Sequence, residues 1–409
     1  MHWLRPWVAG AAALLLAAVA LLLLRVDGRS GTPSGPDRLV QQADADADPA
    51  SVPADASLAQ RVLASRPIDG RAFRLLARIA VAQGEQDRAD ALHGIAARRA
   101  PRDRLTRAAL ADRAFARGDT GEGIAQLDAL MRIAPGLRDE LLLRLAPHLG
   151  DDSLQRALVE HVAASPNWRP HLASVLVATE TAPRAGETLL ARLAARTTLS
   201  PQELAARVTL LQRLQRPTEA RQVWLAALDA RDRAGADADA DPDPDPDPAV
   251  FDGGFEHPDV AGGYGWRIGS PPGIDIAYAT HDAAEGNSAL WLHFEGRAVE
   301  RLEVEQWLAL PAGTWRLEFA ANNATDSSRP FVWEIVCPAT GASFARAQLP
   351  DAASRPQWEK VSVVFAVPTD CTGQLLRLRH LARSLVERRL TGALGIDAMR
   401  ITAVASLPD

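Results

Sequence analysis

Aromatic side chains on the outward faces of predicted strands are the residues of this chain best suited to bind a ligand. In residues 290–294, apolar side chains alternate with Trp291 and His293, so the two sets point to opposite faces of a strand. An outward indole offers a flat apolar surface and one N–H donor, and it can stack on the apolar face of a sugar ring. Trp266 and Trp307, near loop or strand ends, are further candidates. The alternative is that each ring is half-buried beneath a loop.

The sequence contains none of the common catalytic motifs. There is no GxSxG nucleophile motif, no P-loop and no HExxH zinc motif. Glu300, Glu303 and Glu305 could supply the carboxylate pair of a glycoside hydrolase, but alternating charges on an exposed strand explain them more simply. We therefore expect a protein that binds and does not catalyse, with an envelope glycan hydrolase as the alternative.

Clustered arginines offer a second kind of binding chemistry. Arg71, Arg74 and Arg78 are spaced i, i+3 and i+7, which places them on one helical face suited to an acidic peptide. A solvated charged face is the alternative. The cationic run from Arg377 to Arg389 could contact an acidic polysaccharide or a lipid headgroup, or be a solvated hairpin. The formal net charge of -6 gives no overall basic field, so nucleic acid is not an expected partner.

The two cysteines, Cys337 and Cys371, both lie in the C-terminal part of the chain. If they pair, closing a loop of about 35 residues stabilises the fold by about 3–4 kcal/mol in the chain-entropy model. Disulfides persist in oxidising compartments, so pairing favours an extracytoplasmic location. Two buried free thiols are the alternative.

An apolar N-terminal segment predicts a membrane anchor. Residues 6–24 carry no charge, and a helix of that length is long enough to cross the hydrocarbon core of a bilayer. Trp3 and Trp7 lie at one end, where aromatic rings favour the headgroup region. A cleaved signal peptide is the alternative, but the apolar run continues through the small residues 18–20.

The orientation of this anchor follows from two conflicting signals. Arg25, Arg29 and Arg38 would, by charge count, keep the C-terminal side inside the cell. Long domains translocate largely regardless of such charges, and the cysteines favour the outside. We therefore expect a single-pass protein of the bacterial inner membrane with the bulk of the chain in the periplasm.

Composition divides the rest of the chain into four segments, and the candidate binding residues lie in the second and the fourth of them. Residues 27–56 are rich in Gly, Ser, Pro, Asp and Ala, which predicts a flexible tether. Residues 57–233 show apolar spacing of 3.6 and predict helices. Residues 234–249 contain Asp-Ala and Asp-Pro repeats, which predict an extended acidic linker. Residues 250–405 show short alternating apolar runs between turn residues, which predict a β domain.

The helical segment contains a 34-residue repeat that is marked by Pro67, Pro101 and Pro135, with Gly84 and Gly118 at equivalent turns. This pattern resembles the tetratricopeptide repeat. The resemblance implies a solenoid whose concave groove, lined by the arginine face described above, binds a protein partner. The matching positions of the first repeat are Phe73, Leu76, Ala77, Ala80, Ala89, His93 and Pro101.

Short motifs in the C-terminal segment are similar to carbohydrate-binding modules of the galactose-binding-like jelly-roll type. The segment opens with FDGGFE at 251–256 and closes with GIDAMRI at 395–401. The resemblance implies a jelly-roll sandwich in which Glu256 and Asp397 help to hold a structural calcium, since two adjacent carboxylates repel without a cation or a proton. Asp252 replaces the usual Asn of this motif. No other cofactor is expected.

The expected protein is therefore multidomain, with a transmembrane helix, an all-α repeat solenoid and an all-β jelly roll. This combination resembles bacterial repeat proteins associated with envelope or exopolysaccharide production. The resemblance implies a non-enzymatic scaffold whose helical repeats bind a protein and whose β-sandwich binds a glycan. The alternative keeps this architecture and makes the β-sandwich a purely structural or protein-binding module.

Overall fold

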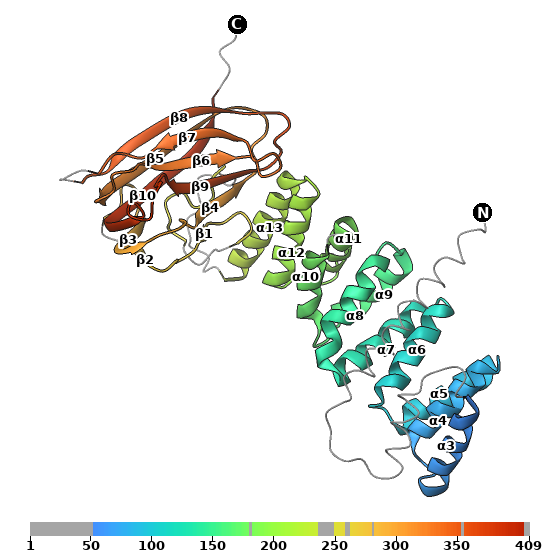
Figure 1. The fold of residues 1–409 in the computed structure, drawn as a ribbon. Helices are drawn as coiled ribbons and strands as arrows, with labels where there is room; N and C mark the ends of the chain where they lie inside the picture. The colour runs from blue at the N-terminus through green and yellow to red at the C-terminus, as the bar shows by residue number, and fades with distance from the viewer. Residues whose placement is uncertain are drawn as a thin grey trace. The chain divides into compact units, whose positions relative to one another are not determined.

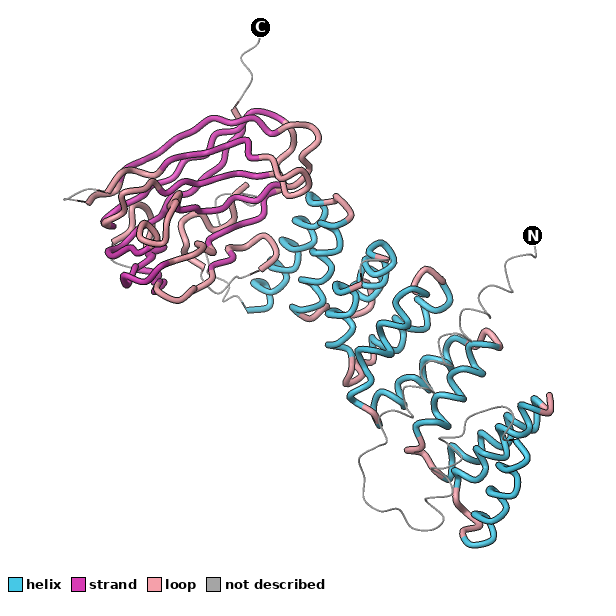
Figure 2. Tube along the Cα trace, viewed as in Figure 1, coloured by secondary structure: helices cyan, strands magenta, loops and turns pink. Residues whose placement is uncertain are grey.

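The structure is a computed structural model, in which helices fill the first part of the chain and strands the last (Figures 1 and 2). The predicted anchor at 6–24 and most of the predicted tether and acidic linker lie outside the described residues. Within the described part of the chain, no helix has the length and apolar character to cross a membrane. The structure describes residues 52–179, 182–235, 249–257, 262–279, 282–352 and 356–404.

Contacts divide the chain into two compact units, Met1–Ala206 and Arg207–Asp409. The helices run through the first unit and into the second, and two short 3-10 turns flank α8. The helices are α3 (Val52–Ser65), α4 (Gly70–Ala82), α5 (Gln86–Arg99), α6 (Arg104–Ala116), α7 (Thr120–Ile133), α8 (Arg138–Leu145), α9 (Asp152–Ala163), α10 (Arg169–Ala178), α11 (Pro183–Ala194), α12 (Pro201–Arg213) and α13 (Pro217–Gly235).

The pair of helices α4 and α5 recurs as α6 and α7, and both helices of the second pair begin 34 residues after their counterparts. Asp69 and Asp103 accept backbone N–H bonds at the starts of α4 and α6, and these bonds satisfy donors that have no partner within the helix. Gly84 and Gly118 both have a φ of 78°, a left-handed conformation that glycine adopts without strain. The membership of these pairs in the tetratricopeptide family stays a prediction.

The last helix, α13, packs against the β part within the second unit. The Trp224 ring meets Phe251 edge-on, with centroids 4.8 Å apart. The Tyr264 hydroxyl donates a 2.7 Å hydrogen bond to the Pro217 carbonyl, and burial raises the pKa of Tyr264 to about 12. A Cβ on Gly263 would lie 2.3 Å from the Trp224 indole, so glycine is needed for this close approach. These contacts make α13 part of the compact unit that contains the strands.

The strands form two five-stranded sheets in which all the described pairings are antiparallel. Sheet A has the order β1-β4-β9-β6-β7, and sheet B has the order β2-β3-β10-β5-β8. The prediction of an all-β sandwich is thus confirmed. The strands are β1 (Arg267–Ile268), β2 (Ile274–Ala279), β3 (Ala289–Ala298), β4 (Val304–Leu308), β5 (Gly313–Thr325), β6 (Phe331–Val336), β7 (Ser343–Gln348), β8 (Glu359–Val367), β9 (Gln374–His380) and β10 (Arg389–Ala403).

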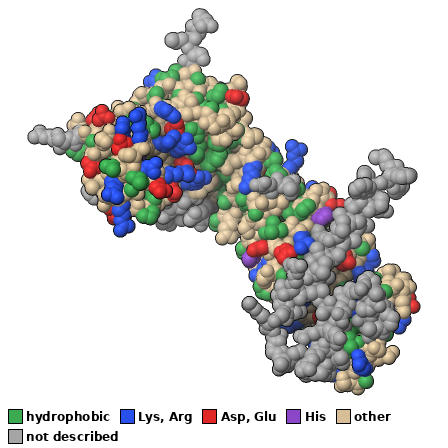
Figure 3. Space-filling view, in the orientation of Figure 1, with side chains coloured by type: hydrophobic (Ala, Val, Ile, Leu, Met, Phe, Trp, Pro, Cys, Tyr) green, Lys and Arg blue, Asp and Glu red, His purple; other side chains and the backbone are tan. Residues whose placement is uncertain are grey.

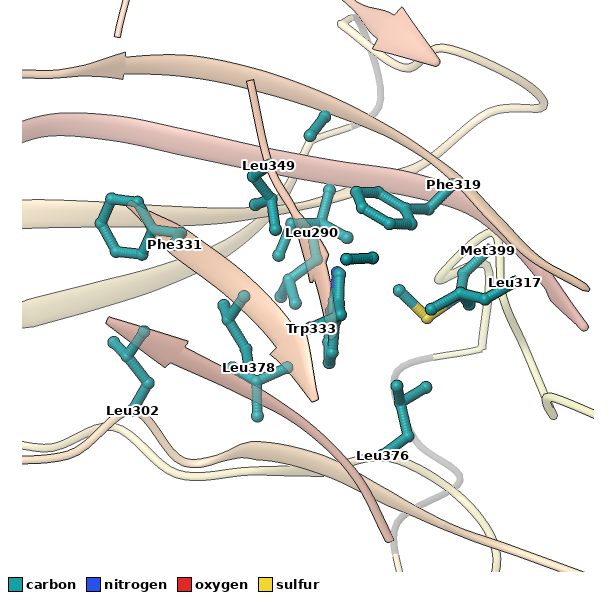
Figure 4. Close-up of a cluster of buried hydrophobic side chains, with 14 of the residues drawn as sticks. Leu290, Leu302, Leu317, Phe319, Phe331, Trp333, Leu349, Leu376, Leu378 and Met399 are labelled. Carbon is teal, nitrogen blue, oxygen red and sulfur yellow. The ribbon is translucent and has the colours of Figure 1, made fainter. Parts of the chain in front are cut away.

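The core between the sheets is built from the alternating positions that the sequence predicts. Figure 4 shows Trp333 of β6 among Leu290, Phe319 and Leu378, all of which are buried. Full burial of each such side chain contributes about 1.5–3 kcal/mol. The inward side chains of β3 and β5, in sheet B, pack against those of β6, in sheet A. The outward side chains of the same strands therefore lie on the surfaces of the sandwich.

Cys337 and Cys371 form a disulfide, with their Cα atoms 5.8 Å apart, and this confirms the predicted pairing. Cys337 follows β6 and Cys371 precedes β9, and these two strands are neighbours in sheet A. The bond therefore ties two adjacent strands at one end of that sheet.

Candidate functional site

The outer face of sheet B carries an aromatic cluster formed by Trp291, His293 and Trp358. The ring centroids of Trp291 and Trp358 are 5.5 Å apart with an interplanar angle of 69°, and those of Trp291 and His293 are 6.2 Å apart with an angle of 18°. Strand register aligns Trp291 with Gly395 of β10, and Gly395 with Asn322 of β5. The indole of Trp291, the glycine backbone at position 395 and the amide side chain of Asn322 therefore lie in one row across three neighbouring strands.

Gly395 makes room for the two indoles. A Cβ at this position would lie 2.8 Å from Cη2 of Trp358 and 2.9 Å from Cζ2 of Trp291. Real Cβ atoms do not approach carbon atoms so closely, because the van der Waals contact distance is about 3.5–4.0 Å. The absence of a side chain on β10 therefore lets both rings lie against the sheet.

Asp282 orients both tryptophans. The indole N–H of Trp291 donates to the Asp282 carbonyl at 3.2 Å, and the indole N–H of Trp358 donates to its carboxylate at 3.1 Å. Trp291 is only 7% exposed, whereas Trp358 is half-buried and His293 is exposed. Trp358 and His293 therefore offer the accessible ring surfaces, and Trp291 supports them.

Asn322 is the polar group of this face that has no partner. It is 6% exposed, and its Oδ1 has no hydrogen-bond partner among the described residues. The inward residues Leu317, Phe319 and Ala321 belong to the core, so Asn322 lies on the opposite, outer face of β5. A buried amide oxygen without a partner costs about 1–3 kcal/mol. The oxygen is covered in this conformation, so a ligand would recover that cost only if the amide rotates to meet its donor.

The outer face of sheet A is different, because it carries a row of alternating charges. Strand register aligns Arg267, Glu305, Arg377, Glu334 and Arg346 across all five strands. Figure 3 shows arginine and carboxylate side chains mixed on the face of the β part in view. This row joins neighbouring strands through their side chains as well as through their backbones.

Glu334 is the centre of this charged row. Arg377 and Arg346 each approach its carboxylate to 2.8 Å, and Arg379 approaches to 3.2 Å. Burial alone would raise the pKa of Glu334, but the hydrogen bonds from these arginines lower it to about 2. The outer face of sheet A is therefore held by ion pairs that leave its central carboxylate fully partnered.

Two of the predicted stacking residues lie away from the aromatic cluster. Trp266 is buried in the core, where its ring lies 5.0 Å from Phe255 and its N–H donates to the Asp252 carbonyl. It therefore presents no ring face to a ligand. Trp307 is half-buried on β4 of sheet A, aligned with Leu375. Trp358 was not predicted from the sequence as a stacking residue. Trp358 directly precedes β8 and alternates with Lys360 and Ser362 of that strand, a pattern that indicates the outer face.

The arginines predicted to line a peptide groove have partners within the helical part. Arg74 is buried and forms a 2.7 Å ion pair with Asp103, the residue that caps α6. Arg71 pairs with Asp69 at 2.7 Å, and Arg78 is half-buried. The sequence pattern identified one helical face correctly. The structure corrects the expected role of Arg74, because a buried guanidinium that joins successive helix pairs is not available to a peptide.

Glu256 and Asp397, the predicted calcium ligands, both bind backbone N–H groups of residues 284–288. Asp397 accepts two such bonds at 2.7 and 2.9 Å, and Glu256 accepts two at 2.7 and 3.0 Å. Burial raises the pKa of Asp397. A Cβ on Gly254 would lie 3.9 Å from an oxygen of each, so the two carboxylates do converge.

These carboxylates fit a cation only in part. In the described ranges, no group of three or more His, Cys, Asp or Glu side chains is arranged to hold a metal ion. The backbone amides already supply partial positive charge to both carboxylates, as a cation would. Calcium at Glu256 and Asp397 stays a prediction.

No protein-family model matches the chain, and no curated protein matches it. Solved structures that are similar to it include the xylan-binding CBM22-1 domain of Paenibacillus barcinonensis Xyn10C, at 13% identity over 35% of this chain and 88% of that one, with a TM-score of 0.25. Others are the C-terminal family 22 module of Clostridium thermocellum Xyn10B (14%, 40% and 100%, 0.27) and the module TmCBM61 solved with β-1,4-galactotriose (15%, 39% and 99%, 0.29). Each of these three similar structures is a carbohydrate-binding module.

Proposed function

We propose that the β-sandwich binds a glycan on the outer face of sheet B, with Trp358, His293 and Asn322 as its contacts. The observation that carries the proposal is the unpartnered Oδ1 of Asn322, in register with Gly395 and the indoles that lie against it. A pyranose ring presents an apolar face and a rim of hydroxyl donors. One sugar can stack on a ring of the cluster, and one of its hydroxyls can donate to Asn322 once the buried amide rotates towards the surface.

The test is glycan binding by the full chain. The purified protein is screened on a glycan array, and the best ligand is then titrated by calorimetry against the wild type and Trp358→Ala. Loss of the stacking surface should weaken binding about tenfold, because ring contacts contribute on the order of 1 kcal/mol or more.

Trp307→Ala is the matched control, since it removes a half-buried tryptophan from the other sheet. It should leave binding unchanged. Saturable binding that Trp358→Ala does not weaken would contradict the site. Absence of binding to any glycan would favour a structural or protein-binding sandwich.

The wider role that we propose is a non-enzymatic scaffold, held at the bacterial inner membrane with most of its chain in the periplasm and binding a protein partner through its helical repeats. The disulfide between Cys337 and Cys371 supports an oxidising compartment for the β part. The test is a pair of C-terminal fusions, to alkaline phosphatase and to a cytoplasmic reporter. Activity of the cytoplasmic reporter alone would contradict the proposed location.

A further inference from the structure

The connection between β9 and β10 presents two adjacent aliphatic side chains to solvent. Leu385 is 65% exposed and Val386 is 79% exposed. Large hydrophobic residues with such exposure are few in the described part of the chain, and these two are consecutive. Isolated exposed hydrophobic residues need no explanation, whereas contiguous exposed apolar surface marks a contact with a partner or a membrane, and these two adjacent side chains form a small surface of that kind.

Hydrogen bonds hold this tip in a defined turn. The Arg388 N–H donates to the Ser384 carbonyl at 3.2 Å, and the Glu387 N–H donates to the Ser384 hydroxyl at 3.3 Å. The Glu387 carboxylate accepts the Arg383 N–H at 2.6 Å and an Arg329 guanidinium bond at 2.7 Å. These bonds attach the turn to the connection that precedes β6. The backbone that carries Leu385 and Val386 therefore has a defined conformation.

Arginines surround the same tip. Arg383 and Arg389 are exposed, and Arg379 is exposed but is already bound to Glu334. The carboxylate in the turn, Glu387, is bound by Arg329. A pocket of about 350 Å³ opens beside the turn, and its lining includes Arg329, Arg379, His380 and Arg383.

His380 does not add charge to this pocket at neutral pH. Its Nε2 lies 2.8 Å from the Ser327 hydroxyl, and its ring stacks on Phe331 with centroids 4.7 Å apart. Burial lowers the pKa of His380, so its imidazole is neutral at pH 7. The positive charge that faces the pocket is therefore supplied by arginine.

We propose that this end of the sandwich docks on an anionic phospholipid surface, with Leu385 and Val386 in the interfacial region and the surrounding arginines on lipid phosphates. Interfacial binding requires buried apolar area together with attraction to anionic headgroups, and the turn supplies both within a few residues. An acidic glycan or a free phosphate would use the arginines but would leave the two aliphatic side chains unexplained. The inference does not depend on glycan binding, which uses the outer face of sheet B.

The test places an environment-sensitive fluorophore at the tip. Both native cysteines are in the disulfide, so a single Val386→Cys substitution can be labelled selectively. The full-length chain is mixed with preformed vesicles of phosphatidylglycerol or of phosphatidylcholine. The label should shift to shorter wavelength only in the anionic bilayer. A label at Val364→Cys, another exposed valine but on the outer face of sheet B, should not shift.

A second substitution tests the cations. In the chain labelled at position 386, Arg383→Ser should raise the phosphatidylglycerol fraction needed for the half-maximal shift. Loss of one arginine near an anionic leaflet should weaken this contact about fivefold. Equal emission in both bilayers, or no effect of Arg383→Ser, would overturn the proposal. A response to soluble polygalacturonate or to inorganic phosphate, without a response to bilayers, would also overturn it and would identify an acidic glycan or a free anion.

Discussion

The two outer faces of the β-sandwich differ in whether their buried polar side chain has a hydrogen-bond partner. On sheet A, Glu334 is buried and is bound by three arginines. On sheet B, Asn322 is also buried, but its Oδ1 has no partner among the residues that the structure describes. The first arrangement is complete within the described residues. In the second, the hydrogen bond must come from water or from a ligand.

This difference indicates which face is the better candidate for ligand binding. Ion pairs across neighbouring strands stabilise a sheet without any ligand, and a glycan would have to break them to use their donors. On sheet B the two indoles already have their N–H groups bound to Asp282, and the half-buried ring of Trp358 and the exposed ring of His293 remain for stacking. A face with unused hydrogen-bonding capacity beside aromatic rings is therefore the better candidate for sugar recognition.

Breaking the charged row should have the largest effect. Glu334→Gln should lower the free energy of unfolding at pH 7 by about 2 kcal/mol, less than a fully buried pair would lose, because its arginines remain partly exposed. The folded-state pKa of Glu334, about 2, lies below the value of 4.5 that is usual for a glutamate. Its contribution to stability is therefore complete above about pH 4.5 and is lost as the pH falls towards 2. Denaturant unfolding between pH 2 and 7 should show this loss in the wild type and little of it in Glu334→Gln.

Glu387→Gln is the matched control for that experiment. The hydrogen bond from Arg329 lowers the pKa of Glu387 to about 2 as well, but its side chain is 21% exposed against 2% for Glu334. Solvent screening should make its effect on stability smaller. Equal losses in the two variants would show that burial of the charged row on sheet A has no special role.

Filling the space above Gly395 should have an intermediate effect, mainly on binding. In Gly395→Val the new side chain would collide with both indoles, so they must move from the sheet. Glycan affinity should fall at least about tenfold, the loss expected from a misplaced aromatic contact. Ala403→Val, at an exposed position of the same strand, is the control and should bind normally. Unchanged affinity in Gly395→Val would show that the positions of these rings do not matter.

Removing the unpartnered amide should have the smallest effect on stability and the opposite sign. Asn322→Leu keeps the branching at Cγ and the number of side-chain heavy atoms and removes the buried oxygen, so the free energy of unfolding should rise by up to about 1 kcal/mol while glycan binding weakens. Asn323→Leu is the neighbouring control, because Asn323 donates to the Pro350 carbonyl and accepts from Thr325. That variant should be destabilised. Destabilisation of Asn322→Leu would mean that its oxygen has a partner, such as ordered water, in solution.

Local periodicity in the sequence predicted the parts of this protein that depend on neighbours along the chain. Alternation in residues 290–294 identified the inward and outward sets of β3, because successive strand side chains point to opposite faces. The 34-residue spacing of prolines matched the recurrence of the helix pair that begins at Gly70. The sequence predicted a pairing of Cys337 with Cys371 in the β part, with two free thiols as the alternative, and the structure shows the disulfide.

The roles of individual side chains depended on contacts between residues distant in the sequence, and these were decided only in the tertiary structure. Strand register placed Gly395 between Trp291 and Asn322, and packing buried Trp266 while it brought Trp358 into the cluster. Alternation states which face a residue occupies, but it does not state which strand lies beside it. The sequence by itself therefore determined the elements and their faces. Sheet order and register, set by packing of the whole sandwich, determined which side chains meet and which one is left without a partner.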